Sequence, residues 1–131
     1  MVKKLRHVEA KLMRGLLDLV ILQFLKASPM HGYQVITKIR KNFGVYFGPS
    51  TIYPLLNALE EKGFIKSHWD LGNERPRKIY DLTRDGEDLL SYTEASLNHI
   101  CRKLATLGLD KIVINGSLSN SLTTMRATEK H

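Results

Sequence analysis

The chain has 131 residues, a length typical of one domain that carries an appended helix. Its single cysteine, Cys101, excludes a disulfide framework within one chain and fits a reducing cytoplasm. The formal net charge of +7 favours a polyanionic partner, either nucleic acid or an anionic membrane surface. The charge is uneven, because Glu9 and Asp18 are the only acidic residues before Ser50.

Residues 11–27 have a helical composition and are apolar nearly all round. Such a helix must be covered on more than one side, which suggests a second subunit. A basic N-terminus before an apolar run also resembles a signal peptide. However, Asp18 and Gln23 interrupt the run, no small-residue cleavage site follows, and the run is too short to span a bilayer. We therefore expect a buried core helix, followed by a turn at Pro29 and Gly32.

A second helix is expected from about residue 31 or 32 to Asn42, with an apolar face of Val35, Ile36 and Ile39. Its basic residues lie on the outer face. A short connection between glycines leads from it to a third helix.

The third helix is expected within residues 48–67. Ser50 or Thr51 is predicted as its N-cap, because a short side-chain oxygen can accept an N–H group of the first turn. Pro54 falls in or beside that turn, where a missing N–H costs little. Gly63 is predicted to end the helix in the left-handed conformation. The apolar face consists of Ile52, Leu55, Leu56 and Leu59.

The opposite face of this third helix carries side chains that donate and accept hydrogen bonds, with no carboxylate at its N-terminal end. These residues are Ser50, Thr51, Tyr53 and Asn57. Two short helices joined by such a turn form a helix-turn-helix, whose second helix meets base edges with its N-terminal residues. An ordinary amphipathic helix with a solvated face is the alternative.

After Gly63 the apolar pattern changes to that of strands. The β-prone segments FIKSHWDL and RKIYDL are joined by turn-forming residues, which predicts a hairpin. Basic residues on its tip can reach a phosphate or enter a narrow minor groove. They are Arg75, Arg77 and Lys78. Three helices and a hairpin are the parts of a winged helix, although basic turns are also common on solvated hairpins.

Thr83 is predicted to cap the next helix, where early acidic residues favour the positive end of the helix dipole. Farther along, apolar residues recur at the spacing of a short coiled-coil seam. The row consists of Leu90, Thr93, Leu97, Ile100, Leu104 and Leu107. We expect this row to pair with a second subunit. Packing on the first helix of its own chain is the alternative.

The expected organisation is a winged-helix DNA-binding domain over residues 1–83, a dimerisation helix region over 84–115 and a flexible polar tail over 116–131. Scattered histidines and the lack of nucleophile or phosphate-loop patterns argue against a metal site, a cofactor or an enzyme. Trp69 is expected in the core or facing the dimer partner, although such an aromatic can also stack on a planar ligand.

Three segments, in this order and spacing, resemble the PadR family of transcriptional regulators. They are LLDLVILQFLKASPMHGYQVITKI, STIYPLLNALEEKGFI and RPRKIYDLTRDGEDLL. The resemblance implies a homodimeric winged-helix repressor whose C-terminal helix dimerises and whose promoter binding is relieved by a small molecule in many relatives. It implies that Tyr33 touches the DNA backbone and that Ser50, Thr51, Tyr53 and Asn57 lie in the major groove, with Arg75, Arg77 and Lys78 on the wing. Glu74 and Ile79 depart from the family's usual small and aromatic residues.

The sequence thus predicts an α+β, mostly α fold, a winged helix-turn-helix with a C-terminal dimerisation helix. The expected function is that of a cytoplasmic, sequence-specific repressor that binds double-stranded DNA as a homodimer, without a cofactor. A small aromatic molecule is a candidate effector. The main alternative is a winged-helix protein-interaction module that binds no DNA. A membrane-surface protein is a weaker alternative.

Overall fold

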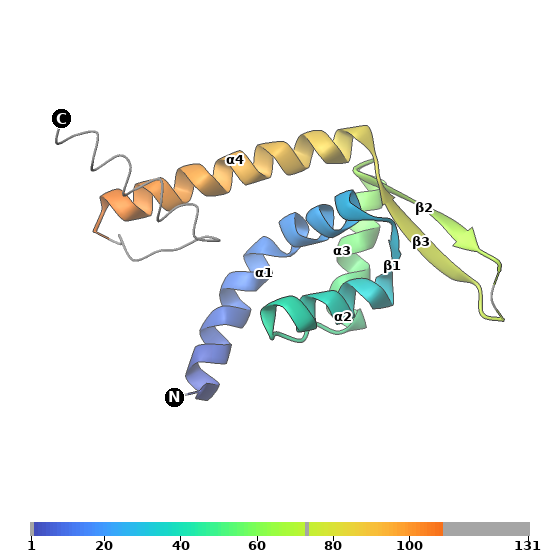
Figure 1. Ribbon diagram of the computed structural model, residues 1–131, viewed down its shortest axis with the longest axis horizontal. Coiled ribbons are helices and arrows are strands. Elements are labelled where there is room, and N and C mark those ends of the chain that lie inside the picture. The colour runs from blue at the N-terminus through green and yellow to red at the C-terminus, as the bar shows by residue number, and fades with distance from the viewer. Residues whose placement is uncertain (1, 73, 109–131) are drawn as a thin grey trace. The chain divides into compact units, whose positions relative to one another are not determined.

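The computed structural model describes residues 2–72 and 74–108. In chain order, the described elements are α1 (Val2–Ala27), β1 (Met30–His31), α2 (Gly32–Phe43), α3 (Pro49–Glu61), β2 (Ile65–Asp70), β3 (Arg77–Leu82) and α4 (Arg84–Thr106). The chain divides into two compact units, one ending at Thr93 and the other beginning at Glu94, so α4 contributes to both. Helices and one small sheet confirm the predicted fold class (Figure 1). The tail expected over residues 116–131 lies outside the described residues.

The first helix is longer than predicted. α1 begins at Val2 instead of residue 11, because the added turns contain helix-favouring Lys, Leu, Arg, Glu and Ala without proline or glycine. Its C-terminal half is the expected core helix, with Leu17, Ile21, Leu22 and Leu25 buried. Its N-terminal half leaves an apolar stripe exposed: Leu5, Val8 and Leu12. No helix in the described part of the chain is long and apolar enough to cross a membrane.

The helix-turn-helix is present and consists of α2 and α3. The apolar face predicted for α2 is buried: Val35, Ile36 and Ile39. α2 ends at Gly44, where a φ of 70° requires the left-handed conformation that glycine adopts freely. The N–H of Gly44 donates to the carbonyl of Arg40 at 2.9 Å, which completes the cap.

The start of α3 corrects the sequence prediction. Gly48 is the N-cap, and its carbonyl accepts from the N–H groups of Thr51 and Ile52, both at 3.0 Å. Pro49 occupies the first helical position, where its fixed φ suits the helix, so the helix begins before Ser50. The side chains of Ser50 and Thr51 therefore lie in the first turn and are not used for capping. Pro54 falls in the second turn, where it removes one intrahelical hydrogen bond.

The end of α3 agrees with the prediction. Gly63 has a φ of 83° and donates to the carbonyl of Glu60 at 3.0 Å, while Phe64 N–H donates to the carbonyl of Leu59 at the same distance. These two bonds form a Schellman motif, which turns the chain from the helix into β2.

The sheet contains a strand that the sequence patterns do not predict. β2 and β3 form the predicted antiparallel hairpin, paired from Ile65 with Leu82 to Asp70 with Arg77. The two-residue strand β1 adds to the other edge of β3, giving the order β1-β3-β2. A strand this short has no periodicity to detect, and the sequence predicts only a turn there. The hairpin extends away from the helices (Figure 1).

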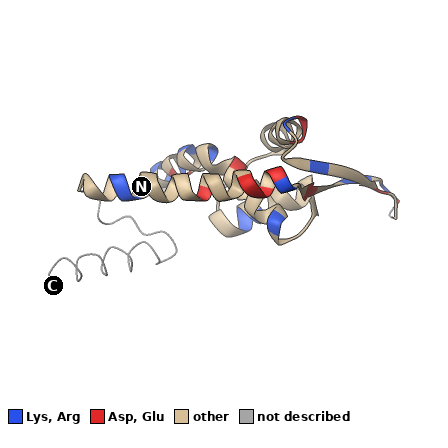
Figure 2. Ribbon diagram, turned by 90° about the horizontal axis from the view of Figure 1, so that it is seen from above, with Lys and Arg blue, Asp and Glu red and all other residues tan. Residues whose placement is uncertain are grey.

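α4 starts at the predicted cap. The hydroxyl oxygen of Thr83 accepts from Gly86 N–H at 3.1 Å, and the Thr83 carbonyl accepts from Glu87 N–H at 2.9 Å. A side chain at Gly86 would collide with the carbonyl oxygen of Phe64, so glycine lets α4 approach this backbone closely. Acidic residues gather at this end of α4 (Figure 2).

The apolar row predicted on α4 is unevenly exposed in the single chain. Leu90 is buried, and Leu97 and Leu104 are half-buried. Ile100 and Leu107 remain 53% and 80% exposed, respectively. Leu90 therefore belongs to the core of its own chain, and the later residues of the row are the ones free to meet a partner.

Candidate nucleic-acid interface

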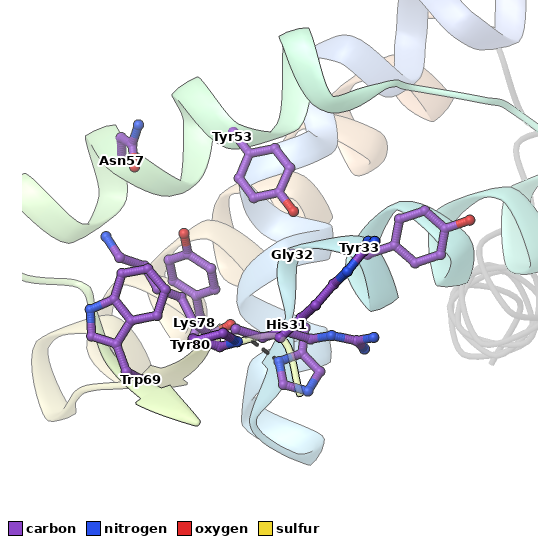
Figure 3. A pocket seen from close by; sticks show the side chains of 11 residues that line it. His31, Gly32, Tyr33, Tyr53, Asn57, Trp69, Lys78 and Tyr80 are labelled. Atoms are coloured by element: carbon purple, nitrogen blue, oxygen red, sulfur yellow. Dashed lines mark hydrogen bonds between the residues drawn. The ribbon is translucent and has the colours of Figure 1, made fainter. Parts of the chain in front are cut away.

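A cleft of about 540 Å³ lies between the start of α2, the middle of α3 and the β2–β3 hairpin (Figure 3). Most of the residues predicted to bind DNA line it: Tyr33, Tyr53, Asn57, Arg75, Arg77 and Lys78. No carboxylate lines the cleft. The fold thus brings the uncharged polar face of α3 opposite the basic side chains of the hairpin, although the two segments are separate in the sequence.

Ser50 and Thr51 lie outside this cleft. Both are in the first turn of α3, where Ser50 is exposed and Thr51 is half-buried. Their place at the helix N-terminus is the one expected for residues that enter a groove first. α3 has no acidic residue in that turn, so the positive end of its dipole is not neutralised locally.

The ring of Tyr53 lies against the first residue of α2. A β-carbon at Gly32 would be 2.6 Å from Cε1 and 2.9 Å from Oη of Tyr53, closer than non-bonded atoms approach. Glycine at this position therefore makes room for the ring, which Figure 3 shows pointing from α3 toward Gly32. This contact gives Gly32 a physical role.

His31 connects the hairpin to the start of α2 through two contacts. Its Nδ1 lies 3.3 Å from the carbonyl oxygen of Lys78, and its backbone pairs with Ile79 in the sheet. The backbone N–H of His31 donates to Oε1 of Gln34 at 2.7 Å, which fixes the first turn of α2. The base of the wing and the helix-turn-helix are therefore held together at one residue.

Trp69 is a cleft residue, and the expectation that it belongs to the core is wrong. Its side chain is 57% exposed, and Nζ of Lys78 lies 5.6 Å from the ring centroid, within range of a cation–π interaction. Trp69 and Lys78 are paired across the hairpin. The sequence did carry a signal for the position of Trp69. Alternate residues of a strand lie on one face, so Trp69 shares a face with Ile65 and Ser67. That face turns toward α3.

A polar contact beneath the cleft joins α3 to the hairpin. The hydroxyl of Ser67 donates to Oε2 of Glu60, and Ser67 pairs with Tyr80 across the strands. Burial raises the pKa of the Tyr80 phenol, and the nearby charges of Glu60 and Tyr53 raise it further. The phenol is therefore neutral over the physiological range and adds no negative charge to the cleft.

The described residues contain no cluster of acidic, histidine and cysteine side chains able to hold a metal ion. What the arrangement offers chemically is recognition: hydrogen-bond donors and acceptors on a helix face, cations on a hairpin and aromatic surfaces between them. A short helix with a polar N-terminal face beside a basic wing defines a winged-helix protein of the kind that reads nucleic acid.

Comparison with known proteins supports this class. Residues 21–92 match the Transcriptional regulator PadR-like family, and the chain belongs to that family. Over 87 residues it is 30% identical to an uncharacterised protein of Lysinibacillus sphaericus, covering 64% of this chain and 80% of the relative.

Solved structures show the same fold. A PadR family transcriptional regulator from Eggerthella lenta DSM 2243 has a TM-score of 0.73 and 30% identity, covering 80% of this chain and 92% of that one. The PadR of Bacillus subtilis, solved in complex with operator DNA, has a TM-score of 0.54 and 29% identity. That similarity covers 58% of this chain and 45% of the Bacillus protein. The resemblance to the PadR family, inferred from the sequence motifs, is thereby confirmed.

Proposed function

We propose that this PadR-like regulator binds double-stranded DNA sequence-specifically and represses transcription as a homodimer. The observation that carries the proposal is the cleft in which Asn57 and Tyr53 of α3 lie opposite the basic wing, with no carboxylate among the lining residues. α3 would enter the major groove with Ser50 and Thr51 leading. Arg75, Arg77 and Lys78 would contact the flanking backbone or minor groove.

Dimerisation is proposed from apolar surface left exposed in each compact unit. The first unit exposes the α1 stripe of Leu5, Val8 and Leu12. The second unit exposes Ile100 and Leu107 of α4. Apolar side chains repeated on helical faces are what an interface between subunits buries. A dimer would present two copies of α3 to half-sites about 34–36 Å apart, one turn of DNA, or a multiple of that spacing.

The family resemblance also supports relief of repression by a small molecule, for which a planar aromatic compound is the candidate class. We include a cytoplasmic location in the proposal, because a regulator that binds double-stranded DNA must reach the chromosome.

The test is a selection of duplexes from a random-sequence pool, followed by fluorescence anisotropy with the selected and the random duplex at several salt concentrations. We expect tighter binding to the selected duplex, with log affinity falling linearly as log salt rises, because phosphate contacts release counterions. A winged-helix protein-interaction module would enrich no sequence and bind neither duplex. That outcome would remove the proposal.

A further inference from the structure

A second hollow lies on the other side of Tyr33 from the cleft. It has a volume of about 400 Å³ and is lined by Tyr33, Ile36, Thr37, Arg40 and Tyr46. We refer to these five residues as the Arg40 notch. Only Tyr33 among them was expected to touch DNA. Since Tyr33 lines both the notch and the cleft, the two hollows adjoin on the surface of the first unit.

The notch follows from the local sequence of α2 and the connection after it. Tyr33, Thr37 and Arg40 have the spacing i, i+4, i+7, so they form one stripe along α2. Beyond Gly44 the chain alternates, with Val45 and Phe47 buried and Tyr46 between them 62% exposed. Alternation therefore turns Tyr46 outward beside the stripe.

Tyr46 also reaches the start of α3. A β-carbon at Gly48, the N-cap of α3, would lie 3.1 Å from Oη of Tyr46. The phenol is thus adjacent to the helix N-terminus that carries Ser50 and Thr51. The notch consequently lies beside the residues expected in the major groove.

The side chains of the notch suit a phosphate oxygen. Arg40 supplies a planar cation with several donors, and Tyr33 and Tyr46 supply hydroxyl groups. No acidic side chain lines the notch, and α2 contains none. The hydroxyl of Thr37 donates to the carbonyl of Tyr33 at 3.1 Å, which leaves recognition of an anion to the arginine and the two phenols.

We propose that the Arg40 notch binds a backbone phosphate of the DNA that the wing cleft engages, so that each subunit holds the duplex on both sides of Tyr33. This inference rests on the proposed function. It extends the DNA interface from the wing and the recognition helix to the connection between α2 and α3. The contact positions the protein and carries no sequence preference, because phosphates are the same at every step.

The experiment compares Arg40→Ala with Lys41→Ala on a random-sequence duplex, by fluorescence anisotropy over a series of salt concentrations. Lys41 is the matched control, because it is the next residue, has the same charge and is exposed outside the notch. Arg40→Ala should reduce the slope of log affinity against log salt by about 0.9 for each notch that contacts DNA. Lys41→Ala should change it by less than half as much.

Tyr46→Phe adds a readout that charge alone does not predict. It should weaken binding several-fold at an unchanged salt slope in the wild-type background, and should have little effect in the Arg40→Ala background, because both groups hold one phosphate. Circular dichroism should show the same helix content for all variants, since the substituted side chains are exposed.

The outcomes separate failure of the notch proposal from failure of the proposed function. If the wild type binds DNA and the Arg40 and Lys41 variants lose equal slope, the effect is diffuse charge and the notch proposal is overturned. If the wild type binds no duplex, the proposed function fails and the notch proposal with it. Replacing chloride by inorganic phosphate at equal ionic strength should displace DNA more readily from the wild type than from Arg40→Ala, because free phosphate competes for the notch. Equal displacement from both proteins would contradict a phosphate site in the notch.

Discussion

The ring of Tyr53 rests where a side chain at Gly32 would otherwise be, 2.6 Å from the position of a β-carbon. Through this contact the first turn of α2 sets the orientation of a residue on α3. The same turn is joined to the wing by the contact of His31 with the carbonyl of Lys78. One short segment thereby positions both parts of the proposed DNA interface.

Gly32→Ala should weaken DNA binding while leaving the protein folded. The added methyl group would push the partly exposed Tyr53 ring aside, and alanine favours helix more than glycine does. In a Tyr53→Ala background the same substitution should have no further effect on DNA affinity and should raise stability by several tenths of a kcal/mol. Anisotropy and urea unfolding on the four proteins check this cycle. An equal affinity loss in both backgrounds would contradict it.

Asn57→Ala should reduce affinity for the selected duplex by about 1–3 kcal/mol and for random DNA much less, because an amide can pair bidentately with adenine. Asn57 is exposed and lines the cleft, so its removal leaves the fold intact. Binding to both duplexes is measured on one preparation. Equal losses would mean that this residue only positions the protein and that base readout lies elsewhere.

Trp69 should report DNA binding directly, since it is the only tryptophan in the chain and lines the cleft. Adding duplex should change its fluorescence with the same midpoint as anisotropy. Trp69→Ala should weaken binding about tenfold, or about 1.4 kcal/mol. Leu71→Ala is the control, because Leu71 is exposed beyond the end of β2 and does not line the cleft. If the Trp69 fluorescence does not change at saturating DNA, the duplex binds away from the wing.

The raised pKa of Tyr80 predicts a stability loss at high pH. A folded-state pKa above the ordinary value of about 10 means that the folded protein keeps a proton that the unfolded chain releases. The stabilisation is therefore fully present below about pH 10 and is lost as the pH rises through the folded-state pKa. Urea unfolding between pH 8 and 11 should show a shallower decline for Tyr80→Phe than for the wild type. Tyr92→Phe, at an exposed position, should behave as the wild type.

Ile100→Asp should dissociate the proposed dimer, because a carboxylate placed in an apolar interface loses its hydration. The dimer should weaken by several kcal/mol, and operator affinity should fall further than one phosphate contact explains, since the two half-sites would no longer be linked. Sedimentation equilibrium checks the assembly, with His99→Asp as a control that adds the same charge beside the row. A dimer of unchanged affinity in the Ile100 variant would move the subunit contact elsewhere.

Local patterns in the sequence were sufficient for much of the fold. The apolar face of α2, the cap at Thr83, the left-handed Gly63 and the β2–β3 hairpin each depend on a few neighbouring residues, so spacing and residue type predicted them. The motifs also identified the PadR family. The residues predicted to contact DNA follow from the side-chain chemistry of one helix or one hairpin at a time. The roles of those residues and of the α4 row remain predictions, and so do the domain boundaries.

Tertiary structure decided the features that depend on residues distant in the sequence. β1 exists because β3 offers it an edge, and two residues have no period of their own. Trp69 lies in the cleft and not in the expected core. It shares a face of β2 with the buried Ile65, but it is farther along the hairpin, where that face lines the cleft. Gly32 and Tyr53 meet only when α2 and α3 pack. Contacts between separate segments leave no periodicity in either one, so they become visible only when the chain is folded.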